Sequence, residues 1–388
     1  MRKLATIQKI SNIRPIPGAD KIEVADVLGW SVVVGKDEFK VGDLAVYFEI
    51  DSFLSASNPA FASFEERFTT WGDKKGMRLR TIKLRKQISQ GLLMPVSKFS
   101  ELSTVAEGDD VSEILNIEKW EALEEQKANS GGLNKAAGGG KFPSFIRKTG
   151  QERVQNYINE LAKHQFETFE VTIKLDGSSM TVYNVVKGSP YYDEIMQDIE
   201  IRQLRRLSKF QRVLYKLKKF FKKGSQPDFV QGVCSRNQEV GINENNNFSN
   251  YVRENGVLEK IQSVSGSYAF QGELIAPSIQ GNYEQVEGFE YHIYDVFDID
   301  KQEYLKPEDA RMLTSFAMLS YVPVQDKSFT LPNGEPREIV DKLLTYAIGD
   351  GMNKGVRREG LVAKSNSSDF SFKIISNEYL LSKEKKMK

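Results

Sequence analysis

A glycine-rich stretch early in the chain constrains the fold more than any other feature. It contains Asn129-Ser130-Gly131-Gly132 and, a few residues later, Gly138-Gly139-Gly140. Glycine and serine supply neither core-forming side chains nor conformational restraint, so such runs behave as flexible linkers. The triple glycine lacks the Gly-Lys-Ser/Thr ending of a phosphate-binding loop. We therefore predict a first domain at 1–112, a connector at 113–150 and a second domain at 151–388, within the length expected for two or three domains.

The first domain has the pattern of a β structure. Turn signals such as Pro17-Gly18-Ala19-Asp20 separate short runs rich in β-branched or aromatic residues. These runs are Leu4–Ile10, Ile22–Leu28, Trp30–Val34, Leu44–Ile50 and Ile82–Leu84. Several short strands that close on themselves predict a small barrel, and five strands fit an OB fold. We predict a loop at 67–86, whose aromatic and basic residues either bind nucleic acid or form a solvated loop.

The second domain mixes strands and helices. The predicted strands are Phe166–Leu175, Met180–Tyr183, Tyr268–Ile275 and Tyr291–Val296, and the predicted helices are Glu308–Leu319 and Glu338–Ile348. The order is not the regular alternation of a parallel α/β fold, so we predict the α+β class.

A basic segment lies inside the second domain. Residues 202–223 include ten basic and no acidic residues, and their leucines recur at helical spacing. We predict an amphipathic helix within an insertion at about 196–226. Such a helix can bind phosphates, an anionic membrane or a partner, or it can pack on its own domain.

The bulk composition bounds the class of protein. With 54 basic and 53 acidic residues the net charge is +1, so any site for a polyanion must be local. A single cysteine, Cys234, excludes an intramolecular disulfide, and two histidines disfavour a histidine-rich metal site. No stretch resembles a signal peptide or a membrane span. We expect a soluble monomer without a membrane partner, cytoplasmic or otherwise intracellular.

The strongest chemical signal is Lys174-Leu175-Asp176-Gly177-Ser178-Ser179, at the end of the apolar run Phe169–Ile173. A strand that ends in a lysine and enters an Asp-Gly turn holds an amine beside a pocket. Desolvation or nearby positive charge can lower the pKa of such an amine and make it nucleophilic. Alone the signal is weak, because such a tetrad occurs by chance in roughly one of ten proteins of this length.

Five further segments follow in order and strengthen the signal. They are Ser235-Arg236-Asn237, Phe270-Gln271-Gly272-Glu273-Leu274-Ile275, Tyr294-Asp295-Val296-Phe297, Arg358-Glu359-Gly360-Leu361-Val362-Ala363-Lys364 and Ser371-Phe372-Lys373-Ile374-Ile375. Each taken singly could be structural: a salt-bridged strand residue, a core aromatic or a surface lysine. Charges inside apolar runs are costly to bury unpaired, however. Several of both signs indicate one polar site in a β-rich cleft.

This ordered set resembles the covalent nucleotidyltransferase superfamily of DNA ligases, RNA ligases and mRNA capping enzymes. Lys174-Leu175-Asp176-Gly177 is similar to the nucleophile motif. In the first part of the chain, residues 18–24, 40–43, 87–92 and 142–149 resemble the OB module of one clade of nick-sealing RNA ligases. In that clade the OB module precedes the catalytic domain, whereas DNA ligases and capping enzymes usually carry it afterwards. The order here favours the RNA ligases.

The resemblance implies an OB-fold barrel followed by a nucleotidyltransferase domain, with ATP and Mg²⁺ or Mn²⁺ as cofactors. It implies Lys174, Asp176, Glu359, Lys364 and Lys373 as catalytic residues; Lys174, Gly177, Arg236, Glu273, Tyr294, Phe297, Val362, Lys364 and Lys373 as nucleotide contacts; and Asp176, Glu273 and Glu359 as metal-binding residues. Tyr294 or Phe297 would stack on one face of adenine, and Val362 or Leu361 on the other.

The implied reaction has three steps. Lys174 attacks the α-phosphate of ATP, AMP passes to a 5′-phosphate, and a 3′-hydroxyl displaces the AMP. The implied partner is RNA, or an RNA/DNA duplex, with a nick. The alternatives are a DNA ligase, a GTP-using capping enzyme, and a nucleic-acid-binding OB protein whose transferase domain is inactive. Intact Lys174, Glu273, Glu359 and Lys373 argue against the last.

Overall fold

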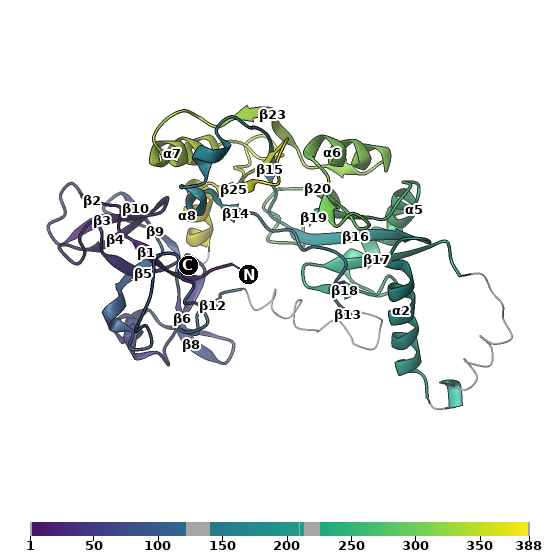
Figure 1. Ribbon diagram of the computed structural model, residues 1–388, viewed down its shortest axis with the longest axis horizontal. Helices are drawn as coiled ribbons and strands as arrows, with labels where there is room; N and C mark the ends of the chain where they lie inside the picture. Colours follow the sequence, from purple (N-terminus) through teal and green to yellow (C-terminus); the bar gives the residue numbers. More distant parts are fainter. Residues whose placement is uncertain (1, 122–139, 209, 213–225, 387–388) are drawn as a thin grey trace.

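The computed structural model describes residues 2–121, 140–208, 210–212 and 226–386. Figure 1 shows a β-rich first domain, drawn in purple and blue, beside a larger α+β second domain. The predicted fold class and the order of the two domains are confirmed. Among the described residues, no helix is both long enough and apolar enough to cross a membrane.

The first domain is built from short antiparallel strands. They are β1 (Ala5–Lys9), β2 (Asn12–Pro15), β3 (Ile22–Val27), β4 (Trp30–Gly35), β5 (Leu44–Phe48), β6 (Ser52–Ser55), β7 (Thr69–Trp71), β8 (Lys74–Arg78), β9 (Thr81–Leu84), β10 (Gln87–Gln90), β11 (Leu92–Pro95) and β12 (Glu118–Lys119), with 3-10 helices η1 (Pro59–Arg67) and η2 (Val96–Lys98). They pair in the orders β1-β5-β11, β2-β3-β4, β9-β10 and β12-β6-β8-β7. All five predicted strands are present.

The predicted loop at 67–86 is wrong. The segment forms β7, β8 and β9, and Thr69–Trp71 pairs with Lys74–Arg78 as a hairpin. The side chain of Trp71 is buried against Phe53, with ring centroids 4.7 Å apart. Burying this aromatic surface outweighs the loop-like polarity of the neighbouring lysines.

Both described ends of the predicted connector pack into a domain. Leu115 and Ile117 belong to the core of the first domain, whereas Phe145 and Ile146 belong to a core cluster of the second. Residues 122–139, which hold most of the glycine-rich stretch, lie outside the described residues. The division at 112 and 150 stays a prediction.

The second domain contains two sheets. Its strands are β13 (Gly140–Lys141), β14 (Glu152–Arg153), β15 (Thr168–Lys174), β16 (Ser178–Val186), β17 (Phe229–Ser235), β18 (Gln238–Val240), β19 (Tyr268–Ile275), β20 (Glu290–Asp298), β21 (Glu303–Tyr304), β22 (Ser320–Tyr321), β23 (Val324–Thr330), β24 (Gly360–Ser365) and β25 (Ser371–Ile375). The larger sheet has the order β13-β18-β17-β16-β19-β20-β21, with β22 beside β20. The smaller has the order β14-β25-β24-β15-β23.

Helices cover these sheets. They are η3 (Val154–Tyr157), η4 (Leu161–His164), α2 (Tyr192–Arg206), α4 (Asn247–Glu254), α5 (Val257–Gln262), α6 (Pro307–Phe316), α7 (Pro336–Tyr346) and α8 (Asn377–Lys386). The helices predicted near 308–319 and 338–348 are α6 and α7. Both have proline in the first turn, where the missing N–H costs no hydrogen bond.

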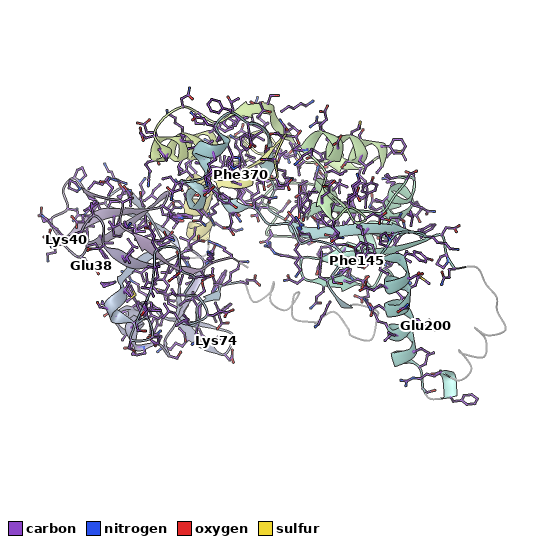
Figure 2. The ribbon with its side chains drawn as sticks, viewed as in Figure 1. Glu38, Lys40, Lys74, Phe145, Glu200 and Phe370 are labelled. Carbon is purple, nitrogen blue, oxygen red and sulfur yellow. The ribbon has the colours of Figure 1, made fainter. Side chains whose placement is uncertain are left out.

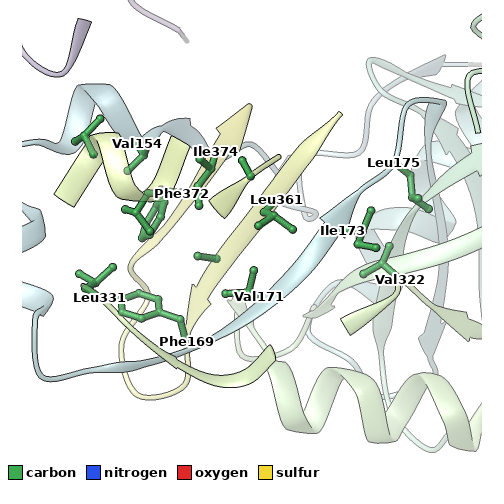
Figure 3. Packing of buried hydrophobic residues seen from close by; sticks show 14 of the residues in the cluster. Val154, Phe169, Val171, Ile173, Leu175, Val322, Leu331, Leu361, Phe372 and Ile374 are labelled. Atoms are coloured by element: carbon green, nitrogen blue, oxygen red, sulfur yellow. The ribbon is translucent and has the colours of Figure 1, made fainter. Parts of the chain in front are cut away.

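The smaller sheet carries a continuous apolar core. Phe169, Val171 and Ile173 of β15 pack with Leu361 of β24 and Phe372 of β25 (Figure 3). Burial of this surface holds β15 in place. Because β15 belongs to the smaller sheet and β16 to the larger, residues 175–177 connect the two sheets. The Lys-Leu-Asp-Gly motif therefore lies at their junction.

The predicted basic helix at 202–223 does not begin where we expected. Helix α2 already begins at Tyr192, where Asp193 and Glu194 complement the positive end of the helix dipole. Tyr192 and Ile195 are buried in the core with Phe145, which extends the helix toward the N-terminal side. The helix ends at Arg206, and residues 213–225 lie outside the described residues.

The two domains make specific contacts. The amide of Gly29 donates to the carbonyl of Gln155 at 2.8 Å, and a Cβ at Gly29 would lie 2.7 Å from the Gln155 Cα, so only glycine fits. Trp30 Nε1 donates to Asn156 Oδ1 at 2.7 Å. Arg337 of α7 donates to Ser31 Oγ at 2.9 Å. The first domain is thereby held against the side of the second that carries Arg153.

Candidate active site

Lys174 lies beside a carboxylate. Its strand β15 pairs with β24 so that Lys174 is opposite Gly360, which brings the preceding residue, Glu359, next to it. Lys174 Nζ donates to Glu359 Oε2 at 2.7 Å. Burial lowers the pKa of Lys174, but the carboxylates of Glu359, Glu273 and Asp176 outweigh burial and raise it. Of the two effects that can lower this pKa, burial is present in the free protein, but the carboxylates dominate.

Two carboxylates, one fully and one partly buried, hold the turn after Lys174. The amide of Gly177 donates to Glu273 Oε1 at 3.1 Å, and the amide of Asp176 donates to Glu284 Oε1 at 3.0 Å. A Cβ at Gly177 would lie 2.5 Å from the carbonyl oxygen of Leu274, so the turn requires glycine. These contacts fix the backbone of the turn from which the Asp176 side chain projects.

The positively charged side chains near Lys174 do not balance the negative charge of the surrounding carboxylates. Burial, opposed by Lys174, raises the pKa of Glu273 to about 7. Burial also raises the pKa of Glu284 to about 7, and its Oε2 is buried without a hydrogen-bond partner. Burial likewise raises the pKa of Glu359. Such a site suits an additional cation, although the described residues do not preassemble three acidic, His or Cys ligands around one point.

Helix α8 closes over Asp176. Tyr379 Oη donates to Asp176 Oδ2 at 2.8 Å, and Lys383 Nζ donates to the same oxygen at 3.0 Å. Tyr379 and Lys383 are four residues apart, so they lie on one face of the helix and also contact each other at 2.7 Å. The C-terminal helix thus competes with any cation for Asp176.

A positive cluster lies on the same sheet as Lys174: Lys373 of β25 pairs with Val362 of β24, which pairs with Thr172, two residues before Lys174. Strand β14 pairs in parallel with β25, which places Arg153 beside Lys373. Arg153 is buried, and its Nε and Nη1 have no hydrogen-bond partner. Burial, together with the charges of Arg153, Lys174 and Arg2, lowers the pKa of Lys373 to about 7. The Nη2 of Arg153 lies 3.8 Å from Asp51 Oδ2, so the guanidinium is only partly paired. Its remaining N–H groups and the neighbouring Lys373 amine suit an anion such as phosphate.

The residues expected around the base lie on β20 and β24. Tyr294 Oη shares a hydrogen bond with Ser179 Oγ at 2.9 Å, and burial raises its pKa. Lys364 Nζ donates to Asp295 Oδ1 at 2.5 Å and lies 5.9 Å from the centre of the Tyr294 ring. Val362 is partly exposed and pairs with Lys373. The side chain of Arg236 is exposed, and its positive charge lowers the pKa of the Tyr294 hydroxyl, against the larger effect of burial.

Phe297 and Leu361, the alternative residues for contacting adenine, do not lie at the site. Phe297 is fully buried in a different core cluster with Phe145 and Tyr183, the former labelled in Figure 2. Leu361 is fully buried in the core of the smaller sheet. Of the alternatives, Tyr294 and Val362 are therefore the ones placed to contact a ligand.

Four residues of this cluster were missed by the sequence analysis: Arg153, Glu284, Tyr379 and Lys383. Arg153 lies in the two-residue strand β14 and Glu284 in an irregular segment, and neither is long enough to show a repeating pattern. Tyr379 and Lys383 have helical spacing, which alone indicates only a shared helix face. The weak signal available for Arg153 was a charged residue next to the apolar Val154.

Comparisons with known proteins agree with this architecture. The sequence profile of an OB-fold domain matches residues 4–96, and that of RNA ligase matches residues 167–375. A structure of Naegleria gruberi RNA ligase with pyrophosphate is 38% identical, with a TM-score of 0.80, covering 99% of this chain and 100% of that one. A lysine-to-alanine variant of the same ligase with ATP and Mn is 37% identical, with a TM-score of 0.78, covering 98% and 99%.

A glutamate-to-alanine variant of that ligase with AMP and Mn is 38% identical, with a TM-score of 0.78, and again covers 98% of this chain and 99% of that one. No curated protein sequence matches this chain significantly. The fold and the site define an enzyme of the covalent nucleotidyltransferase class. Within that class, the chain belongs to the RNA ligase family.

Proposed function

We propose that this RNA ligase is ATP-dependent and joins 3′-hydroxyl and 5′-phosphate ends through a lysyl-AMP intermediate on Lys174. The observation that carries the proposal is that β pairing places Lys174 beside the carboxylate of Glu359, at 2.7 Å, and on the same sheet as the neighbouring Arg153 and Lys373. A metal–triphosphate complex has this division of charge. The Naegleria ligase structures with ATP, AMP and Mn support the same ligands.

The first step transfers AMP to the lysine. The neutral Nζ of Lys174 attacks the α-phosphorus, a nitrogen–phosphorus bond forms, and the bond to pyrophosphate breaks. Lys373 and Arg153 bind the phosphate oxygens and stabilise their charge. Asp176, Glu273 and Glu359, with Glu284 as an addition, would hold Mg²⁺ or Mn²⁺. The bound cation supplies positive charge that offsets these carboxylates and thereby favours the neutral form of Lys174.

The remaining residues would orient the nucleoside. Tyr294 would stack on one face of adenine and Val362 would contact the other. Glu273 would accept hydrogen bonds from the ribose hydroxyls, and Arg236 would contact ribose or phosphate. Lys364 would bind phosphate after releasing Asp295, its partner in the free protein.

The substrate we propose is a nick in a duplex whose 3′-hydroxyl strand is RNA. The support is the position of the OB domain before the catalytic domain, and the contact of its Trp30 ring with Arg153, whose guanidinium carbon lies 5.8 Å from the ring centre. An intracellular location and a monomeric state remain predictions from the sequence.

Labelled nucleotides and defined RNA ends test the proposal. The protein is incubated with ATP or GTP labelled at the α-phosphate and with Mn²⁺, and then with nicked duplexes whose 3′-hydroxyl strand is RNA or DNA. We expect label from ATP only and sealing when the 3′-hydroxyl strand is RNA. Label from GTP would instead indicate a capping enzyme, and equal sealing of both duplexes would remove the RNA preference.

We expect binding of metal-free ATP to weaken above pH 7. The pKa of Lys373 is about 7 in the free protein, so the side chain is charged below pH 7 and must take up a proton to bind phosphate above it. The dissociation constant should rise by up to about tenfold per pH unit. Calorimetry between pH 6 and pH 9 measures it. Lys373→Arg stays charged, so its pH dependence should be weaker; identical profiles for both proteins would contradict the role of Lys373.

We expect Lys383→Met to lower the Mn²⁺ concentration required for lysyl-AMP formation. The substitution removes a cation 3.0 Å from the Asp176 carboxylate. Because Lys383 is partly exposed, the decrease in the required Mn²⁺ concentration should be modest, between roughly 1.5-fold and 5-fold. A titration of Mn²⁺ against label retained by the protein measures the effect. Lys342→Met, on α7, is the matched control, and an equal shift in both variants would contradict the competition.

A further inference from the structure

The hairpin formed by β9 and β10 has an unfavourable turn. Leu84 pairs with Gln87, so Arg85 and Lys86 form a two-residue loop. Their φ angles are 47° and 70°, both in the left-handed region. Turns of this kind are most often Asn-Gly, because a Cβ at positive φ is strained. An Asn-Gly sequence would be less strained at these two positions, but two long cationic residues occupy them.

The tip of this hairpin is exposed and its cations are unpaired. The side chains of Lys83, Arg85 and Lys86 are exposed, and among the described residues none of the three forms a side-chain hydrogen bond or an ion pair. Ile82 and Leu84 beside them are each 39% exposed. The tip thus presents cations that are free to contact phosphate oxygens, as Arg and Lys do in complexes with nucleic acids.

The base of the hairpin is rigid. Ser89 and Gln90 are buried, and Ser89 Oγ accepts a hydrogen bond from the amide of Val33 in β4 at 2.9 Å. Gln90 Nε2 donates to Asn377 Oδ1, the first residue of α8, at 3.2 Å. Figure 1 shows β9 and β10 beside α8, and β9 contacts that helix. Because α8 also carries the Tyr379 that binds Asp176, the hairpin is anchored next to the active site.

We propose that the β9–β10 hairpin is an RNA-binding element in which Lys83, Arg85 and Lys86 contact substrate phosphates near the ends being joined. The proposal rests on the RNA ligase function proposed above and names part of its substrate-binding surface. Strain retained at the turn is explained if binding requires two cations there, since strained residues concentrate at functional sites. The chain carries a net charge of only +1, so an RNA site depends on such local clusters.

The test replaces the turn by its favoured sequence. Arg85→Asn/Lys86→Gly removes two positive charges and the backbone strain together. The stability of the protein should therefore rise while its affinity for RNA falls. The control is Lys36→Gln/Lys40→Gln, which also removes two exposed charges from the first domain; Figure 2 places Lys40 at its outer edge. Sealing of a nicked duplex starts from protein already carrying AMP, so ATP binding does not affect the rate.

For Arg85→Asn/Lys86→Gly we expect an unfolding temperature about 2 °C higher. We also expect the RNA concentration for half-maximal sealing to rise about tenfold, and the slope of affinity against salt to fall by roughly one to two. RNA affinity and salt dependence equal to those of the control would overturn the proposal. Failure of the unsubstituted protein to take up AMP or to seal would instead contradict the proposed function, so the two failures are distinguishable.

Discussion

Replacing Lys174 with alanine is expected to abolish covalent AMP and the sealing of 5′-phosphate ends, with sealing reduced by at least about a thousandfold. The amine is the attacking group and β15 holds it beside Glu359, at 2.7 Å, whereas the nearby amine of Lys383 is bound to Asp176. The variant should still join an RNA whose 5′ end already carries AMP, since that substrate bypasses the lysine intermediate. Label retained by the denatured protein and product formed from each substrate are the two measurements.

Lys174→Arg serves as the matched control, because it keeps a positive charge beside Glu359 but cannot act as an amine nucleophile near neutral pH. It should also lack covalent AMP. Normal sealing of 5′-phosphate ends by either variant would show that the reaction does not pass through Lys174.

Replacing Trp30 with alanine is expected to lower the free energy of unfolding by about 3–5 kcal/mol. The side chain is fully buried in the first domain, and its Nε1 donates to Asn156 of the second. Asn156 in turn donates to Glu49 at 2.6 Å, so the loss also weakens the contact between the domains. The ring centre lies 5.8 Å from the guanidinium carbon of Arg153, so phosphate binding should weaken as well.

Unfolding in urea, followed by fluorescence and circular dichroism, measures the change in stability. Trp30→Phe keeps an aromatic ring but loses the hydrogen bond. Loss of that bond should lower the free energy of unfolding by about 1 kcal/mol, and the loss of packing should be smaller than in Trp30→Ala. Trp120→Ala, a partly exposed tryptophan of the same domain, is a further comparison. A loss below about 1 kcal/mol for Trp30→Ala would contradict the importance of the interface.

The strands and charged residues found from the sequence are those marked by a pattern within a single segment of the chain. Strands such as β15 and β19 were found because their apolar residues form continuous runs bounded by charged or turn residues. Lys174, Glu273, Glu359 and Lys373 were found because charges interrupt those runs, and β pairing then brings them together.

Features that depend on distant contacts were not predicted. The direction of the pKa shift of Lys174 depends on Glu273 and Glu359, which are far away in the sequence. Trp71 is buried by Phe53 of another strand, which converts an apparent loop into a hairpin. Helix α2 begins before the basic segment because Tyr192 and Ile195 find a core that the charge pattern does not reveal.

The most direct test of the central claim is the mass of the protein after incubation with ATP and Mn²⁺. The protein is first treated with pyrophosphate to remove any AMP already attached. We expect the mass to increase by one AMP and the modified peptide to contain Lys174, whereas GTP leaves the mass unchanged. An unchanged mass with ATP, or AMP attached to a different residue, would contradict the account.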